Sequence, residues 1–469
     1  MLEELPLDRT TTRASSQPSI HHHLTQQTEP PLSIPDGGYG WVCTICVAVI
    51  NAHSWGINTA YGVFLAHYIS DQTFPGASRL EYALVGSLTI GCTLLISPLV
   101  TIIVREFGTK STMLCGALIQ SISLICASLA TKIWHLFLTQ GVLFGIGMGL
   151  LFLPSVGLVA QWFTKRLALA SGITNAGAGL GGLTYSLCTG AMIQNLGLIW
   201  TLRILSLITF IVNVTFTVLI KDRYKTLAPR QLAFDTSLFR RIEYVLVLAF
   251  RAFSMLGYFV LIFTLANYAN EIGLDASQAA IVSAMFSLGQ TVGRPVLGHL
   301  GDSFGRINMA TFTTLLVGIL SLTIWVNAKT YGVLLLFSLL GGIPAGTFWI
   351  SASPILADVI GLENLPSGLS ILWLVLVLPS TFSSPIALQI FSKTGSYIGA
   401  QLFTGLGFIA AGVCMGLLRG WAITRAKSLM SSSAVQADSQ TESQGPSNNR
   451  LGHVNIWSTV TNSVKWANV

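Results

Sequence analysis

The sequence contains few charged residues. Asp, Glu, Lys and Arg make up only 9% of its 469 residues, whereas a soluble domain usually has roughly 25%. Hydrophobic residues make up 52%, and the mean hydropathy is +0.67. Because a soluble fold of this size would need more charge to cover its surface, the composition excludes an ordinary soluble enzyme and a disordered scaffold. The net charge of +7 is attributed to membrane-protein loops and not to nucleic-acid binding.

Other features are missing as well. Residues 1–35 are polar and lack the apolar stretch of a cleavable signal peptide, so they are predicted to form a disordered cytoplasmic tail. The run His21–His23 in this tail is interpreted as incidental and not as a metal site. The predicted spans contain no H-x-x-H pair and the chain has no G-x-x-x-x-G-K-S/T sequence. We therefore expect no metal, no cofactor, no ATP-driven cycle and no enzymatic activity.

Cysteine use points the same way. The chain has seven cysteines, and all of them lie in apolar stretches. They are predicted to be small buried thiols and not a disulfide framework.

Long apolar segments fill most of the chain. A bilayer core of about 30 Å requires about 20 apolar residues per helix, and twelve segments meet this length. They are predicted at 40–70, 80–104, 112–131, 134–160, 167–193, 198–220, 243–268, 276–299, 309–328, 332–359, 368–391 and 398–419. The prediction is an all-α membrane protein built as an N-terminal six-helix half (36–220), a connector (221–242), a C-terminal six-helix half (243–419) and a disordered tail (420–469).

The distribution of Lys and Arg predicts the orientation. If both ends of the chain face the cytoplasm, most of these residues fall in the cytoplasmic tails, the short loops and the connector. The positive-inside rule therefore predicts cytoplasmic termini. The plasma membrane is the default location, with the vacuolar membrane as the alternative. Two six-helix halves are typical of a transporter with its substrate site between the halves.

A loop motif follows the eighth predicted helix. It reads Gly298-His-Leu-Gly-Asp302-Ser-Phe-Gly305-Arg306 and resembles the G-x-x-x-D-x-x-G-R/K signature of the major facilitator superfamily. Gly305 permits a tight turn, while Asp302 can accept a hydrogen bond from Arg306 or cap a neighbouring helix. The resemblance implies a gating element at the cytoplasmic surface and not a binding site.

Two further motifs resemble a narrower family. Asp36-Gly37-Gly38-Tyr39-Gly40-Trp41 precedes the first helix, and Trp162-Phe163-Thr164-Lys165-Arg166 precedes the fifth, continuing to Gly172 and Gly177. The first is similar to the D-G-G-x-G-W entry motif of the monocarboxylate porter family, and the second lies where that family has another motif. Over residues 36–420 the chain resembles a fungal-type member of this family.

The residue types in these motifs are mainly structural. Asp36 and the glycines are predicted to cap the first helix, and Lys165 and Arg166 to anchor their loop to the anionic leaflet. Gly172 and Gly177 are expected to let one helix face pack closely.

Charges inside the membrane are costly and mark candidate sites. Two arginines lie well inside predicted spans, away from the span ends: Arg251 and Arg294. Arg294 matches the helix-8 arginine that, in the porter family, is thought to hold the substrate carboxylate. The alternatives are that Arg294 extends toward the cytoplasmic end or pairs with Asp302. No family motif supports Arg251, and its role as a substrate ligand or a structural residue stays open.

The chain also departs from the family. Animal members carry a lysine where this chain has Thr59, next to Asn58, and a carboxylate where it has Gln290. Neither Thr59 nor Gln290 can take up a proton, so the family's lysine–aspartate coupling does not carry over. His53 is the remaining candidate for a proton relay, although a lone helical histidine is more often simply packed. Tyr61 is a further candidate substrate ligand beside Asn58.

The leading hypothesis is a secondary-active transporter of small organic anions, most simply monocarboxylates, working by alternating access as a symporter. One alternative keeps the fold but moves riboflavin or exports a fungal secondary metabolite. A remote third is a membrane sensor or enzyme that transports nothing. The expected partners are a small-molecule substrate and the lipid bilayer, with no nucleic acid, and the sequence does not indicate whether an ancillary subunit exists.

Overall fold

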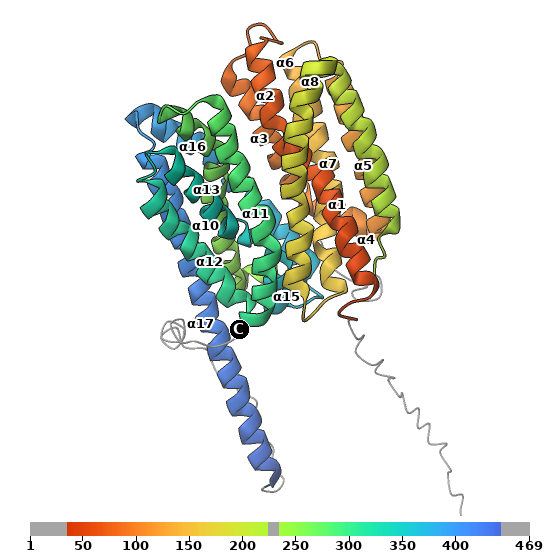
Figure 1. Cartoon of the computed structure of the whole chain (residues 1–469). Helices are drawn as coiled ribbons and strands as arrows, with labels where there is room; N and C mark the ends of the chain where they lie inside the picture. The colour runs from red at the N-terminus through yellow and green to blue at the C-terminus, as the bar shows by residue number, and fades with distance from the viewer. Residues whose placement is uncertain (1–34, 224–233, 442–469) are drawn as a thin grey trace, which may run out of the picture. The chain divides into compact units, whose positions relative to one another are not determined.

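The computed structural model describes residues 35–223 and 234–441, in which helices alternate with loops and no strand forms (Figure 1). The N-terminal tail to residue 34, residues 224–233 of the connector and residues 442–469 lie outside this description, so the predictions made for them are untested. All described residues belong to one compact unit.

The N-terminal half contains six spans, several of them bent or broken. Their helices are α1 (Tyr39–Thr59), α2 (Tyr61–Ser70), α3 (Arg79–Leu95), α4 (Ser97–Phe107), α5 (Thr109–Ala127), α6 (Ile133–Leu136), η1 (Phe137–Leu143), α7 (Phe144–Leu158), η2 (Val159–Gln161) and α8 (Leu167–Leu219). The 53-residue α8 would be about 80 Å long, which is more than twice the bilayer core. It is broken at Gly197, where φ is 80° and ψ is 163°, and it therefore supplies two spans.

The C-terminal half repeats this plan after the short connector helix η3 (Thr236–Arg240). Its helices are α10 (Ile242–Glu271), α11 (Ala276–Phe304), α12 (Arg306–Leu320), η4 (Ser321–Trp325), α13 (Tyr331–Ala345), α14 (Thr347–Ile350), α15 (Ala352–Ile360), α16 (Leu365–Thr394) and α17 (Ile398–Thr441). One predicted span, 332–359, is thus three helices, α13 to α15, with breaks at Gly346 and Ser351.

The spans agree with the predicted all-α membrane fold. Among the described residues, nine helices are long and apolar enough to cross a bilayer, or ten if the pair Leu84–Leu95 and Ser97–Phe107, bent by 48°, counts as one span. The break in α8 adds one more. The last is α11, which is 29 residues long but more polar, because it carries Arg294 and Asp302. It packs against α8 and α13 inside the bundle, which completes the predicted twelve.

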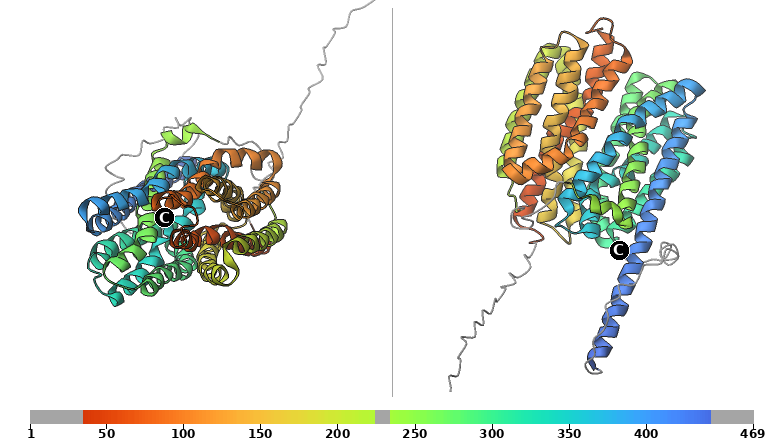
Figure 2. Two further views of the ribbon diagram at one scale, coloured as in Figure 1. Left: turned by 90° about the horizontal axis from the view of Figure 1, so that it is seen from above. Right: turned by 180° about the vertical axis from the view of Figure 1, so that it is seen from behind.

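The two halves lie side by side (Figures 1 and 2), with α8 against α11 and α16 against α3 and α4. We call the end where α1 begins, α8 ends and α10 begins the connector end, and the opposite end the far end. Glycine lets the halves approach closely: a Cβ on Gly172 of α8 would lie 2.4 Å from the Arg294 carbonyl oxygen of α11. Within the N-terminal half, a Cβ on Gly177 would lie 2.0 Å from the Ala48 oxygen, as close packing of that face requires.

Two predictions about local structure are wrong. The tail predicted to be disordered from residue 420 continues as helix α17 to Thr441, and Ile423 is buried. Extending an existing helix costs far less than starting one, so a polar segment can continue it. Cys115 and Cys188, predicted to be buried, are exposed. A membrane helix is as apolar toward lipid as toward its neighbours, so composition does not distinguish the two faces.

Candidate functional site

Arg294 lies at the interface between the halves and is only 5% exposed. Its Nη1 donates to the Asn175 carbonyl oxygen of α8 at 2.6 Å, and its Nη2 donates to Gln290 Oε1 at 2.6 Å and to the Tyr258 hydroxyl at 3.2 Å. Tyr258 in turn donates to Gln290 at 2.7 Å. The guanidinium therefore has neutral acceptors from three helices. The alternative that it pairs with Asp302 is not what the structure shows.

A break in the neighbouring span makes room for this guanidinium. Gly346 separates α13 from α14, and a Cβ built there would lie 2.7 Å from Arg294 Nε. That Nε has no hydrogen-bond partner among the described residues. Sequence reasoning missed Gly346 and Tyr258. The signal for Tyr258 was its position seven residues after Arg251, nearly two turns along the same helix face.

Arg251 is the second buried charge. Its side chain is 0% exposed, and its Nη2 donates to the Ser351 hydroxyl at 3.2 Å. Within the described part of the chain, its Nε and Nη1 have no hydrogen-bond partner. Burying donors of a charged group without partners is unfavourable, so this arrangement calls for an explanation.

Aromatic rings from both halves meet between these arginines and α1. Trp349 of α14 lies 5.1 Å from the Trp55 ring of α1 and 5.9 Å from the Trp373 ring of α16, measured between centroids. Phe152 of α7 contacts all three, and Phe348 and Tyr258 continue the cluster on the C-terminal side. The indole N–H groups of Trp55 and Trp373 have no partner among the described residues. The cluster forms a mainly apolar wall that also carries these two donors.

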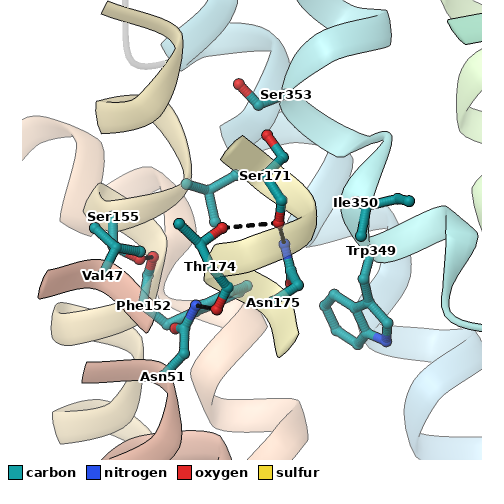
Figure 3. Close-up of a pocket in the computed structure, with 11 residues that line it drawn as sticks. Val47, Asn51, Phe152, Ser155, Ser171, Thr174, Asn175, Trp349, Ile350 and Ser353 are labelled. Carbon is teal, nitrogen blue, oxygen red and sulfur yellow. Dashed lines mark hydrogen bonds between the residues drawn. The ribbon is translucent and has the colours of Figure 1, made fainter. Parts of the chain in front are cut away.

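A small cavity lies beside this wall (Figure 3). From the N-terminal half, Asn51 donates to the Thr174 carbonyl oxygen at 3.0 Å, and the Asn175 side chain donates to the Ser171 oxygen at 2.8 Å. Trp349, Ile350 and Ser353 form the opposite side. The space holds about one water molecule, so in this state the path between the halves is nearly closed here.

The structure brings some predicted ligands together. Gln290 contacts Arg294 directly. Asn58 is half-buried and lies one turn beyond Trp55 on the same face of α1, toward the far end. Thr59 is exposed, and its hydroxyl donates to the Trp55 carbonyl oxygen at 2.9 Å.

Two other candidates lie elsewhere. Tyr61 donates to the Tyr82 carbonyl oxygen at 2.7 Å, within the N-terminal half. The His53 Nδ1 lies 2.8 Å from the Val49 oxygen, and its ring meets Tyr185 edge-on at 5.5 Å. His53 is two residues from Asn51 and Trp55, so it projects from the other side of α1, away from the interface.

Asp36 joins the two predicted family motifs. Its Oδ1 accepts hydrogen bonds from the backbone N–H groups of Thr164 at 2.6 Å and Lys165 at 2.8 Å. Burial by itself would raise the pKa of Asp36, but backbone donors from Thr164, Lys165 and Arg166 outweigh it, and the pKa is lowered. Of the residues predicted to cap the first helix, Gly38 lies at the N-cap position of α1, with φ 60°, whereas the prediction is wrong for Asp36.

The rings of the two motifs also pack together. Trp41 meets Phe163 edge-on with 4.8 Å between centroids. A Cβ on Gly40 would lie 2.8 Å from the Trp162 Cβ, so glycine is needed there. The Lys165 and Arg166 side chains are exposed.

The loop motif that runs from Gly298 to Arg306 contacts the same loop from the C-terminal half. Asp302 accepts from the backbone N–H groups of Ala168 at 3.0 Å and Leu169 at 2.8 Å, capping α8, and from Arg306 Nε at 3.2 Å. Both predicted roles of Asp302 are thus present. Arg306 also donates to the Thr164 oxygen, and it pairs with Asp358 at 2.9 Å. Gly305 supplies the turn with φ 93°. Asp36, residues 164–169, Asp302, Arg306 and Asp358 form what we call the connector-end cluster.

The family follows from comparison with known proteins. Residues 43–250 and 247–434 each match the Major Facilitator Superfamily. The chain belongs to this superfamily.

Similar proteins within the superfamily indicate which kind of transporter this chain is. The chain is 31% identical over 410 residues to probable transporter MCH2 of Saccharomyces cerevisiae, covering 86% of this chain and 87% of that protein. It is 26% identical over 413 residues to monocarboxylate transporter 10 of Mus musculus, covering 83% and 80%. The resemblance to the monocarboxylate porter family is therefore confirmed, and the chain is a major facilitator transporter of the monocarboxylate-transporter-like type.

A solved superfamily structure agrees on the fold. A variant of the E. coli fucose:proton symporter FucP superposes with a TM-score of 0.64 at 14% identity, over 81% of this chain and 98% of that one. At this identity the likeness concerns the fold alone. The superfamily match and the apolar helices together describe a multi-pass membrane protein.

Proposed function

We propose that this transporter carries small organic anions, most simply monocarboxylates, and that Arg294 binds the carboxylate. The observation that carries the proposal is the position of Arg294, which is buried between the halves and whose hydrogen-bond acceptors in the described part of the chain are all neutral. A guanidinium binds a carboxylate through two parallel charge-assisted hydrogen bonds, which are stronger than its bonds to neutral acceptors. An entering carboxylate would therefore displace Gln290 or the Asn175 carbonyl oxygen.

The transport cycle that we propose is alternating access. Two sets of contacts hold the halves together near the connector end. One is made by Arg306 and Asp302 of the connector-end cluster to residues 164–169. The other is the hydrogen bond from Ser97 to the Ser370 oxygen, 2.8 Å long, farther from that end. Opening this end requires these cross-half contacts to break, while the Asp36 contacts stay within one half. We take the connector end as cytoplasmic, because Lys165, Arg166 and Arg306 lie there, and we place the protein in the plasma membrane.

Proton coupling has its own test. Gln290 is neutral where the family carries a carboxylate, so a proton-coupled cycle would use His53. This histidine lies on the far side of α1 from the interface and would act by moving that helix. Acid-stimulated uptake that His53→Gln abolishes is the expected result for symport. Uptake that is equal at about pH 5 and about pH 7.5 contradicts it.

The central experiment measures uptake of a panel of labelled short monocarboxylates, with riboflavin included, in transporter-deficient cells. We expect uptake of at least one carboxylate, and Arg294→Gln should abolish it while the protein reaches the cell surface normally. Arg203→Gln is the matched control, because Arg203 contacts Ser128 within the N-terminal half. Carboxylate uptake that survives Arg294→Gln contradicts the proposed mechanism.

A second candidate is movement of riboflavin or another flat, neutral metabolite. The aromatic cluster around Trp349 favours it, because stacked rings and indole N–H groups without partners among the described residues suit a planar cargo. Neutral cargo should be indifferent to Arg294→Gln. Accumulation of riboflavin in both the parent and the variant, with no carboxylate uptake, would establish this alternative.

A further inference from the structure

Arg251 carries a buried charge that the proposed function does not use. Within residues 35–223 and 234–441 its guanidinium has one hydrogen bond, to Ser351, and it lies 5.4 Å from the centre of the Phe250 ring. In the described segments no carboxylate pairs with it, and two of its three nitrogens have no acceptor. An ionisable group this deep in a membrane bundle normally has a partner or a ligand.

The charge balance of the interface is therefore incomplete. Arg294 also lacks a carboxylate partner within the described residues, since its acceptors are two neutral side chains and a carbonyl oxygen. A bound monocarboxylate would compensate one of the two guanidinium groups and leave the other buried without a counter-charge. A cargo with two negative groups would compensate both.

The geometry places both arginines at the same short element. Arg294 Nε lies beside Gly346, directly before α14, and Arg251 Nη2 bonds Ser351, directly after it. The backbones of Gly346 and Ser351 are about 7–8 Å apart along the helix axis, and each guanidinium lies near one of these two ends. A short chain between two carboxylates matches such a separation better than a long one.

The α10 helix joins the same two groups. Arg251 and Tyr258 project from one face of α10, and the Tyr258 hydroxyl accepts from Arg294. Ser254 lies between them along the helix, and its buried hydroxyl has no partner among the described residues. Between Arg251 and Arg294, hydrogen-bonding groups of Arg251 and Ser254 and the Nε of Arg294 therefore have no partner among the described residues.

From these observations we infer a second anion subsite, made by Arg251 with Ser351 and Ser254, and a short dicarboxylate as cargo. One carboxylate would bind at Arg294 and the other at Arg251. The inference rests on the proposed function, because it takes Arg294 as the first carboxylate site. It adds the substrate class, a dianion where the family resemblance alone implies a monoanion.

The test compares two labelled four-carbon acids that differ in one carboxylate, succinate and butyrate, in transporter-deficient cells. Uptake of succinate should exceed that of butyrate. Arg251→Gln should lower succinate uptake about tenfold or more, since it removes a charge-assisted contact, and should change butyrate uptake far less. Arg294→Gln should abolish both, and Arg203→Gln should change neither.

Controls keep the result decisive if Arg251→Gln folds poorly. Surface abundance is measured for every variant, and Arg251→Lys retains the charge and should restore part of the succinate uptake. In purified protein, succinate should raise the melting temperature of the parent and not that of Arg251→Gln or, if that variant is unstable, of Ser351→Ala combined with Ser254→Ala.

Three results separate the possible failures. Butyrate uptake without succinate uptake overturns the second subsite and leaves the proposed function standing. An equal loss of both acids in Arg251→Gln and in the double serine variant, at normal surface abundance, also overturns it. No uptake of either acid, nor of the wider monocarboxylate panel, contradicts the proposed function itself.

Discussion

The N-terminal and C-terminal halves contribute different chemistry to the interface between them. The N-terminal half offers neutral groups, such as Asn51 and the Asn175 carbonyl oxygen. The C-terminal half supplies Arg251 and Arg294 together with the polar side chains that hold them. Two halves of one fold have thus become a charged side and a neutral side. A negatively charged cargo would be held by the C-terminal half, while the N-terminal half closes over it.

The helices α1 and α10 show the same difference between a neutral and a charged side. Trp55 of α1 and Tyr258 of α10 both contact Trp349, so each half places a large aromatic ring at the centre. Only Tyr258 has a polar link to an arginine. The N-terminal counterpart, the indole N–H of Trp55, has no partner among the described residues. Substitutions in the two halves should therefore have unequal effects on uptake.

The largest effect is expected from paired substitutions of Arg294 and Asn51. Arg294→Gln should abolish carboxylate uptake, because it removes charged hydrogen bonds that each contribute roughly 1.5–3 kcal/mol, a factor of about 10 to 100 in affinity. Asn51→Ala should lower it only severalfold, since it removes a neutral group. Initial uptake rates at matched surface abundance check this. Equal losses would mean that the two halves bind the cargo equally.

A large conformational effect is expected from Arg306→Ala. The substitution removes the contacts from Arg306 to Asp302, Asp358 and the Thr164 oxygen, and so weakens closure at the connector end. The population open at that end should rise about tenfold or more. The measurement is labelling of Ser171→Cys, which lines the cavity, by an impermeant thiol reagent applied to that side. Lys165→Ala, which alters an exposed side chain in the same cluster, is the control and should leave labelling unchanged.

A smaller effect is expected from Gly346→Ala. The new Cβ would lie 2.7 Å from Arg294 Nε, and the flexible arginine side chain would move to accommodate it. We expect a severalfold loss of carboxylate affinity with little change in melting temperature. Gly332→Ala, in the same span but with open space around it, should leave uptake unchanged. A large fall in stability for Gly346→Ala would show that Arg294 cannot shift.

The smallest effect is expected from Asp36→Asn. The substitution weakens two hydrogen bonds at a partly exposed carboxylate, so it should cost about 1 kcal/mol of stability. Folding lowers the pKa of Asp36. The carboxylate therefore contributes fully above its unfolded pKa of about 3.9 and loses its contribution as the pH falls through the lower folded value. Melting temperatures of the two proteins should differ equally from about pH 5 to 8 and converge below about pH 4. A difference that varies with pH near neutrality would assign the effect to another group.

Sequence reasoning located the candidate residues better than their contacts. Arg294 was identified because a charge in an apolar segment is conspicuous, and Gln290 because it stands where the animal porters carry a carboxylate. His53 was chosen as the remaining titratable side chain in the first span, and Tyr61 because it lies close to Asn58 in the sequence. The structure separates these two residues from the interface, since His53 faces Tyr185 and Tyr61 faces Tyr82 within the N-terminal half. The sequence predicts where a residue lies along a helix, but it does not predict how that helix is rotated about its axis.

The sequence by itself determined the membrane class, the twelve spans and the division into two halves, because apolar length and the placement of Lys and Arg are local properties that the bilayer reads directly. Only the tertiary structure decided the partners: Asp36 holds a loop 128 residues away, and Arg294 meets Tyr258 and the Asn175 carbonyl oxygen. These pairs depend on how closely glycine-lined helices approach and how each is rotated. Many long-range contacts act together to set both, and no single segment encodes them.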